Sequence, residues 1–386
     1  MSGAIPVLWL CGPSGVGKTT VAWEIYSRLT QSGVDAAYVD IDQLGMCHPE
    51  PASDPGRHRL QAENLGAVVA GYQAAGARCV VVSGVVDPAH GVYVDKIPQA
   101  VLTVCRLRVE RAELERRLVG RQGAAELVPE ALREADAMGA SDFTDVCIDT
   151  TGLSADEVAG LVRDRIGDWP ALDHLDPSTE VAQPHGGTAA TAADGQILWL
   201  CGVTGVGKST IGFEVYLKTL RSGLAGAYVD LDQIGFCSPA PPDDPRNHRL
   251  KARILPALWR TFRAAGAQCL TVVGPAEDQT AVERYIEALP AATVTVCRLH
   301  AGRDELTRRI RSRGQGGSWS QPGDPLNGRP AAYLLDVADQ AATEAEALER
   351  SGLGDLRVGT DGQTAQEVAE AILAHVGPIV GRVARP

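Results

Sequence analysis

The residues with the clearest chemistry are two glycine-rich segments, GPSGVGKTT at positions 12–20 and GVTGVGKST at positions 202–210. Each fits the pattern GxxxxGK[ST], and each lies between a short apolar run and an amphipathic segment, as a phosphate-binding loop lies between a strand and a helix. Glycines allow successive backbone N–H groups to turn toward one anion, and the positive end of the following helix strengthens the attraction. The sequence therefore predicts two nucleotide-binding loops, and their duplication makes a chance glycine-rich turn a poor alternative.

Phosphoryl-transfer chemistry suggests a role for several residues of these loops. Lys18 and Lys208 are expected to reach the β- and γ-phosphate oxygens of ATP and to assist catalysis there. The hydroxyls of Thr19 and Ser209 are expected to contact Mg²⁺. The predicted nucleotide-binding residues are Gly12, Ser14, Gly15, Val16, Gly17, Lys18, Thr19 and Thr20 in the first loop, and Gly202, Thr204, Gly205, Val206, Gly207, Lys208, Ser209 and Thr210 in the second.

Two carboxylates, two residues apart, end the second apolar run of each repeat, in VDIDQLG and VDLDQIG. Alternate residues of a strand face the same way, so Asp40 and Asp42 can both face the first loop. Asp230 and Asp232 are placed alike in the second repeat. One carboxylate of each pair would orient water on Mg²⁺, and the other would accept the proton of an attacking hydroxyl. The alternative is that Asp42 caps the following helix, because aspartate favours helix N-caps.

A repeated HRL segment, which opens a helix after a proline-containing loop, supplies Arg59 and Arg249. Their guanidinium groups can bind an acidic group of the acceptor, with a surface salt bridge as the alternative. The preceding histidines, His58 and His248, are weaker candidates for contact with a ligand.

Four further arginines lie in LERRLVGRQG and LTRRIRSRGQGG. Arg117 and Arg121 are four residues apart and so share one helix face, as do Arg309 and Arg313. We expect them to belong to a mobile flap that closes over ATP, neutralises charge during transfer and excludes water. A solvated, charged helix face is the alternative.

The whole chain is a tandem repeat. When the chain is compared with itself at a shift of 190 positions, LWLCG at 8–12 aligns with a second LWLCG at 198–202, and AYVDIDQLG aligns with AYVDLDQIG. We place the first domain at 1–169, a linker rich in Pro, Gly, Thr and Ala at 170–195, and the second domain at 196–386. The second domain carries a loop-like insertion near 314–333 that the first domain lacks.

Within each repeat, apolar runs alternate with amphipathic segments. Such alternation predicts parallel βαβ units and a three-layer α/β/α domain, whose ligands bind beyond the carboxyl ends of the strands. In the first repeat the predicted strands are 7–11, 36–42, 79–85, 100–107 and 146–149, and the predicted helices are 19–33, 58–76, 111–121 and 154–166.

Composition limits the partners. Lys and Arg total 36 against 48 Asp and Glu, and a net charge of about −12 opposes general nucleic-acid binding. The nine cysteines are scattered without a CxxC pair, which favours a reducing cytoplasm over a disulfide framework or a zinc site. No signal peptide and no apolar stretch of membrane-spanning length is visible. We therefore expect a cytoplasmic protein whose partner is a small-molecule acceptor rather than nucleic acid or a membrane.

With these motifs, each repeat resembles the small-molecule P-loop kinases, a group that includes shikimate, gluconate and adenylylsulfate kinases. The DxD spacing is most similar to shikimate kinase. That resemblance implies that the first Asp of each pair, Asp40 or Asp230, lies on the magnesium side, and that the second, Asp42 or Asp232, faces the acceptor hydroxyl. It also implies that Arg59 holds an acceptor carboxylate.

The resemblance has one clear limit and one further implication. Shikimate kinases carry a Gly-Gly motif at the third strand, where this chain has Ser83-Gly84 and Val273-Gly274-Pro275, so the acceptor itself does not transfer. The segments IDTTG at 148–152 and VGTDG at 358–362 stand where such kinases line the adenine.

The sequence as a whole predicts an ATP- and Mg²⁺-dependent phosphotransferase with two fused kinase domains, which phosphorylates a hydroxyl of a small polar metabolite. Both domains are expected to be catalytic but to differ on the acceptor side. One alternative is a nucleotide-dependent switch or binding module. Another is one active kinase joined to a regulatory pseudo-copy.

Overall fold

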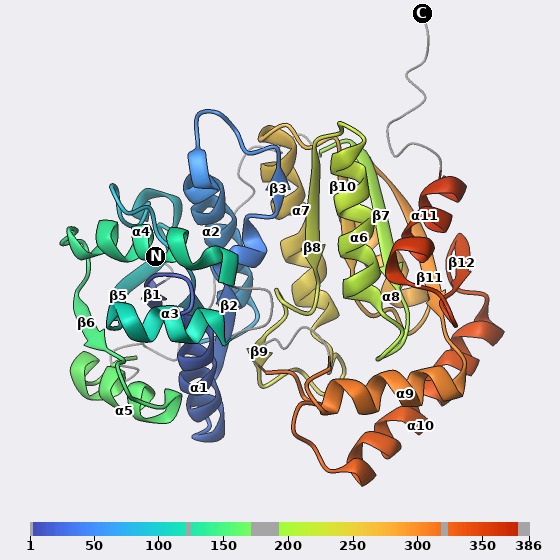
Figure 1. Cartoon of the computed structure of the whole chain (residues 1–386). Helices are drawn as coiled ribbons and strands as arrows, with labels where there is room; N and C mark the ends of the chain where they lie inside the picture. Colours follow the sequence, from blue (N-terminus) through green and yellow to red (C-terminus); the bar gives the residue numbers. More distant parts are fainter. Residues whose placement is uncertain (1–2, 121–124, 171–192, 318–322, 377–386) are drawn as a thin grey trace, which may run out of the picture. The chain divides into compact units, whose positions relative to one another are not determined.

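The chain divides into two compact units in a computed structural model that describes residues 3–120, 125–170, 193–317 and 323–376 (Figure 1). Unit 1 is formed by Met1–Gly45, Ala52–Thr188 and Ile234–Leu250. Unit 2 is formed by Met46–Pro51, Ala189–Gln233 and Lys251–Pro386.

Unit 1 is built on a six-stranded sheet with the order β6-β5-β1-β4-β2-β9. All neighbouring strands are parallel except β2 and β9. Its strands are β1 (Ile5–Cys11), β2 (Ala36–Asp40), β4 (Cys79–Ser83), β5 (Ala100–Arg108), β6 (Val146–Asp149) and β9 (Cys237–Ser238). Its helices are α1 (Lys18–Gln31), α2 (His58–Ala74), α3 (Arg111–Val119), α4 (Val128–Gly139) and α5 (Ala155–Ile166), with short 3-10 turns at Ile41–Leu44, Pro55–Arg57, Val94–Lys96 and Ala125–Leu127.

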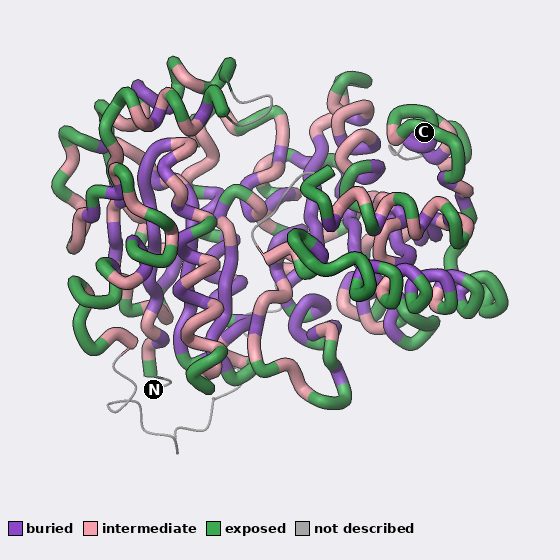
Figure 2. The backbone as a smooth tube through the Cα atoms, turned by 60° about the horizontal axis from the view of Figure 1, so that its bottom comes forward, coloured by how far each residue is buried: buried purple, intermediate pink, exposed green. Residues whose placement is uncertain are grey.

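The sheet of unit 1 is buried on both faces, which is why its strands are continuous apolar runs (Figure 2). Leu8 and Leu10 of β1 point to the face where α1 and α5 pack. Trp9, between them, points to the opposite face and meets residues of α2. Helices therefore cover both faces, which confirms the predicted three-layer α/β/α domain.

Unit 2 repeats this architecture with the sheet order β12-β11-β7-β10-β8-β3, in which only the β8–β3 pair is antiparallel. Its strands are β7 (Gly195–Cys201), β8 (Gly226–Asp230), β10 (Cys269–Val273), β11 (Ala292–His300), β12 (Leu356–Gly359) and β3 (Cys47–His48). Its helices are α6 (Lys208–Arg221), α7 (His248–Ala264), α8 (Gln279–Ala288), α9 (Arg303–Gly314), α10 (Ala331–Ser351) and α11 (Ala365–Val376). The fold class predicted from the sequence, two tandem and mainly parallel α/β domains, is confirmed.

The sixth strand of each sheet comes from the other repeat. β9, from the second repeat, pairs with β2 of unit 1, and the Tyr38 N–H donates to the Phe236 carbonyl at 2.9 Å. β3, from the first repeat, pairs with β8 of unit 2, and the Tyr228 N–H donates to the Met46 carbonyl at 2.9 Å. The predicted boundaries, 1–169 and 196–386, do not anticipate this reciprocal exchange of edge strands and otherwise stay a prediction.

Three helices among the described residues were not predicted from the sequence. α4 follows α3 in the first repeat. α8 follows the third strand of the second repeat, where the first repeat has an irregular segment, and α10 begins at Ala331. The last residues of the predicted insertion, 331–333, are therefore helical, while residues 318–322 of that insertion lie outside the described part of the chain. No helix among the described residues is long and apolar enough to span a bilayer.

Candidate active sites

Both glycine-rich loops adopt the backbone conformation that an anion site requires. Gly12, Gly15 and Gly17 have φ values of 148°, 84° and 104°, and the matching glycines of the second loop lie in the same region. A Cβ atom at Gly12 would stand 2.4 Å from the Leu107 carbonyl oxygen, so the loop passes tightly over the end of β5. α1 then begins at Lys18, and no side chain caps its first N–H groups. Those N–H groups remain available to an anion.

In unit 1 a carboxylate already bonds to this loop. The Ser14 N–H donates to Oε2 of Glu134, a residue of α4, at 2.9 Å. A carboxylate at this position stands in for a phosphate oxygen, and its presence shows that the loop suits an anion. Sequence reasoning missed Glu134, because a lone acid on an unpredicted helix has no motif.

The two loop lysines turn back onto their own loops. Lys18 Nζ donates to the Pro13 carbonyl at 3.0 Å, and the residue is 8% exposed. Lys208 Nζ donates to the carbonyls of Gly202 and Val203 at 2.9 and 3.0 Å. Each ammonium group thus lies at its loop, where phosphate oxygens can replace the carbonyls.

A hydroxyl and the first carboxylate of the DxD motif meet in both units. Thr19 Oγ1 donates to Asp40 Oδ2 at 3.0 Å, and Ser209 Oγ donates to Asp230 Oδ2 at 2.8 Å. In unit 1 the Ser83 hydroxyl adds a second bond to Asp40, at 2.9 Å. The structure thus brings together the residues predicted for Mg²⁺. No cluster of three His, Cys, Asp or Glu side chains in the described ranges could hold a metal ion.

The first Asp, and not the second, provides the helix cap. Asp40 Oδ1 accepts the Asp42 N–H at 3.0 Å at the start of the 3-10 turn, and Asp230 does the same for Asp232. The alternative that Asp42 is the N-cap is therefore wrong. The Asp42 side chain is left exposed at the strand end, as an acceptor-facing group would be.

One carboxyl group of each DxD pair has a raised pKa. In unit 1 burial and the neighbouring Asp40 carboxylate raise the pKa of Asp42, although solvent reaches its side chain, while Lys18 opposes the shift. In unit 2 burial and the Asp232 carboxylate raise the pKa of Asp230 instead. In both units the nearby carboxylate thus disfavours a second negative charge at the end of the strand.

Arg117 and Arg309 brace the loops. Arg117 donates to the carbonyls of Val16 at 3.0 Å and Thr150 at 2.8 Å. Arg309 donates to the carbonyls of Val206 and Thr360, both at 2.8 Å. Each guanidinium also pairs with a glutamate of its own helix, Glu113 or Glu305. Both arginines thus tie the phosphate-binding loop to the segment after the last strand, whereas the sequence placed them on a mobile flap; their catalytic role stays a prediction.

The second arginine of each predicted flap differs between the units. Arg121 lies outside the described residues. Arg313 pairs with Asp324, whose side chain is 2% exposed, at 2.6 Å. Arg313 thus anchors the segment after α9, and no phosphate contact of either residue is tested.

The acceptor arginines are both exposed. Arg59 lies over the Tyr93 ring, with its guanidinium carbon 5.5 Å from the ring centroid. Arg249 pairs with Asp243 at 2.7 Å and with Asp244 at 3.4 Å. The salt-bridge alternative therefore describes Arg249, and the acceptor role of Arg59 stays a prediction.

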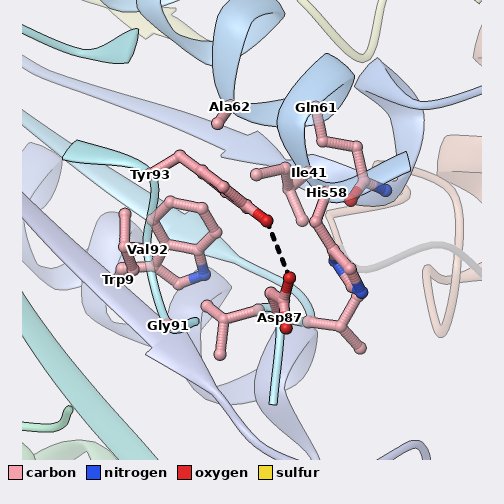
Figure 3. Close-up of a pocket in the computed structure, with 11 residues that line it drawn as sticks. Trp9, Ile41, His58, Gln61, Ala62, Asp87, Gly91, Val92 and Tyr93 are labelled. Carbon is pink, nitrogen blue, oxygen red and sulfur yellow. Dashed lines mark hydrogen bonds between the residues drawn. The ribbon is translucent and has the colours of Figure 1, made fainter. Parts of the chain in front are cut away.

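A small pocket lies on the α2 face of the sheet of unit 1 (Figure 3). It is lined by Trp9, Ile41, His58, Gln61, Ala62, Val85, Val86, Asp87, Gly91, Val92 and Tyr93. The Tyr93 hydroxyl donates to Asp87 Oδ2 at 2.8 Å. Burial lowers the pKa of His58, and the Asp87 carboxylate opposes that shift. Of these residues, sequence reasoning had marked only His58, as a weak candidate.

The fold and the loops define this chain as a P-loop protein with two α/β domains in tandem. A family model described as an AAA domain matches residues 7–142, within the first repeat. No curated protein matches the chain.

Several solved structures match about half of the chain. The tunicamycin resistance protein of Deinococcus radiodurans is 21% identical, with a TM-score of 0.32, and the match covers 47% of this chain and 96% of that one. A shikimate kinase from Bacteroides thetaiotaomicron is 14% identical, with a TM-score of 0.32 and coverage of 47% and 97%. A gluconokinase from Sinorhizobium meliloti 1021 is 19% identical, with a TM-score of 0.29 and coverage of 47% and 93%.

Proposed function

We propose that this protein is an ATP- and Mg²⁺-dependent phosphotransferase of the cytoplasm that phosphorylates a hydroxyl group of a small polar molecule. The observation that carries the proposal is the grouping, at the end of β2 in unit 1, of a phosphate-binding loop, the Thr19–Asp40 pair and the exposed carboxylate of Asp42. A phosphate-binding loop alone serves many functions, whereas a second carboxylate beside the magnesium ligands suits transfer to a hydroxyl.

The chain supplies positioning and charge. Backbone N–H groups of the loop and the start of α1 would hold the phosphates, and Lys18 would exchange the Pro13 carbonyl for a phosphate oxygen. Thr19 and Asp40 would hold Mg²⁺, which screens the charge of the phosphates when bound. Arg117 would keep the loop in place through the Val16 carbonyl. Asp42 would orient the acceptor hydroxyl and take its proton.

The test measures ADP formation by the full chain with ATP, Mg²⁺ and a panel of hydroxyl compounds: gluconate, shikimate, fructose and tunicamycin. Acceptor-dependent ADP and a phosphorylated product are expected, and Asp42→Asn should lower turnover by roughly 10² to 10⁴ while leaving ATP affinity unchanged. ATP binding without transfer to any acceptor, water included, would favour the nucleotide-dependent switch. Full turnover by Asp42→Asn would remove Asp42 from the mechanism.

A further inference from the structure

The two units differ at one position beside the second Asp of the DxD motif. In unit 2, Lys251 Nζ lies 2.9 Å from Asp232 Oδ1, and the lysine side chain is 5% exposed. Shifted by 190 positions, its counterpart in unit 1 is Gln61, which is uncharged. The Lys251 ammonium therefore occupies the Asp232 oxygen that an acceptor hydroxyl would otherwise contact. Unit 2 therefore supplies an internal cation at the place where unit 1 has an amide.

A second difference concerns the side chains that pack beside the tryptophan of the first strand of each repeat, Trp9 in β1 and Trp199 in β7. In unit 1, Trp9 lines the pocket together with Tyr93, which lies in an irregular segment after β4. In unit 2 the counterpart of Trp9 is Trp199, and the segment after β10 is helix α8. α8 places Tyr285 against Trp199 with the ring centroids 4.8 Å apart, and Tyr285 is 1% exposed. The ring of Tyr285 thus fills space beside the tryptophan.

The pocket of unit 1 has unused hydrogen-bonding groups. Trp9 Nε1 and Gln61 Oε1 are buried without a hydrogen-bond partner in the described part of the chain, and both residues are at most 5% exposed. Such groups are costly unless a ligand or water pairs with them. Trp199 Nε1 also lacks a partner within the described ranges, so the contrast between the units depends on Lys251 and Tyr285 and not on the tryptophan.

From these contrasts we infer that phosphoryl transfer takes place in unit 1 alone, and that unit 2 binds nucleotide while Lys251 and Tyr285 hold the place of an acceptor. The acceptor of unit 1 is a small hydroxyl compound whose hydroxyl lies at Asp42 and which has a further polar group that donates to the Gln61 carbonyl oxygen. Its hydroxyl oxygen bonds to the γ-phosphorus as the bond to the leaving ADP oxygen breaks, and Asp42 receives the hydroxyl proton. This inference rests on the proposed function, and it departs from the expectation, drawn from the sequence, that both domains are catalytic.

A reciprocal exchange of charge tests the inference. Gln61→Lys gives unit 1 the ammonium of unit 2, and we expect ADP formation with water or with the acceptor panel to fall at least about 100-fold, the usual scale for losing a general base. Lys251→Gln is the matched control and should leave ADP formation unchanged. Gln61→Met separates charge from hydrogen bonding, and it should raise KM for the acceptor while largely sparing kcat.

A second readout needs no acceptor. A carbodiimide joins an ion-paired carboxylate and amine as an amide, so peptide mapping of the carbodiimide-treated wild-type chain should find a crosslink between Asp232 and Lys251. Gln61→Lys should add a crosslink between position 61 and Asp42, with two nucleotide sites still seen by calorimetry. These two results show that the variant is folded and that the new pair forms.

Three outcomes would overturn the asymmetry: no Asp232–Lys251 crosslink, full turnover by Gln61→Lys despite its new crosslink, or a loss of ADP formation in Lys251→Gln as large as in Gln61→Lys. Failure of the proposed function is distinguishable from all three, because the wild-type chain would then form the Asp232–Lys251 crosslink but no ADP with any acceptor.

Discussion

The ammonium groups of Lys18 and Lys208 bond to carbonyl oxygens of their own loops. A phosphate oxygen is a stronger partner for an ammonium than a carbonyl, so nucleotide binding should redirect both side chains. We expect calorimetry to find about two nucleotide sites per chain, and Lys18→Ala and Lys208→Ala should each remove one. A single site in the wild-type chain, or a variant that loses neither, would contradict this prediction.

Glu134 presents a negative charge to the loop of unit 1, where a nucleotide would bring phosphates. Removing that charge should favour the nucleotide by about 1 kcal/mol, or about fivefold in affinity, for charges near 4 Å apart in a solvated site. Glu134→Gln should therefore tighten ATP binding at the first site only. Glu130→Gln, an exposed acid on the same helix, is the control and should change nothing. Weaker binding by Glu134→Gln would mean that Glu134 assists the nucleotide instead.

At the scale of the elements, the sequence predicted those parts of the fold that leave a local, periodic pattern. The loops, β1, α1 and the DxD strands were predicted because an apolar run, a glycine-rich turn and an amphipathic stripe each leave a local signal. α4 and α8 were not predicted, and the two-residue strands β3 and β9 are too short to show alternation. The Thr19–Asp40 pair followed from the motif, whereas the Lys251–Asp232 pair depends on tertiary contact that no spacing reveals.

Helix α10 is attached to the sheet of unit 2 through Glu349. Its carboxylate accepts from Arg298, which is 4% exposed, at 2.7 Å, and from Arg357 at 2.8 Å. These hydrogen bonds lower the pKa of Glu349 to about 2, from an ordinary value of 4.5. The folded-state pKa is the lower one, so the stabilisation is complete above pH 4.5 and is lost as the pH falls toward 2.

Glu349→Gln should therefore lower the melting temperature at pH 7, because the buried Arg298 loses its carboxylate partner. The difference between variant and wild type should shrink as the pH falls from 4.5 toward 2. Thermal unfolding at several pH values measures this, with Asp336→Asn, an exposed acid of the same helix, as the control. A difference independent of pH would show that Glu349 stabilises α10 through packing and not through charge.

At the scale of the whole molecule, the exchanged strands join the two repeats more closely than a tandem arrangement of independent domains would. Unit 1 includes Ile234–Leu250, and unit 2 includes Met46–Pro51. Each repeat expressed alone would lack the strand that the other repeat supplies, β9 beside β2 or β3 beside β8, and unpaired edges favour aggregation. Duplication of the whole domain therefore has a structural consequence even if unit 2 transfers no phosphate.

The exchange of edge strands predicts that a substitution in the exchanged segment of one repeat destabilises the unit built mainly from the other repeat. Two substitutions test this. Phe236, from the second repeat, packs against Trp23 and Tyr38 of unit 1, at centroid distances of 5.0 and 5.8 Å. His48, from the first repeat, bonds through Nδ1 to the hydroxyl of the buried Tyr216 of unit 2 at 2.6 Å. Phe236→Ala and His48→Ala should each cost about 2 kcal/mol, from lost aromatic packing and from a lost buried hydrogen bond.

Amide hydrogen exchange locates the effect of each substitution, because local destabilisation speeds exchange in the elements that lose contacts. Phe236→Ala should speed exchange in β2 and α1 of unit 1 and spare β8, although Phe236 lies in the second repeat. His48→Ala should do the reverse, speeding exchange in α6 and β8 while sparing β2. Each variant thus serves as the control for the other. If each substitution instead affected only the elements of its own repeat, the edge strands would stay within their repeats in solution, and the two domains would be independent α/β folds in tandem.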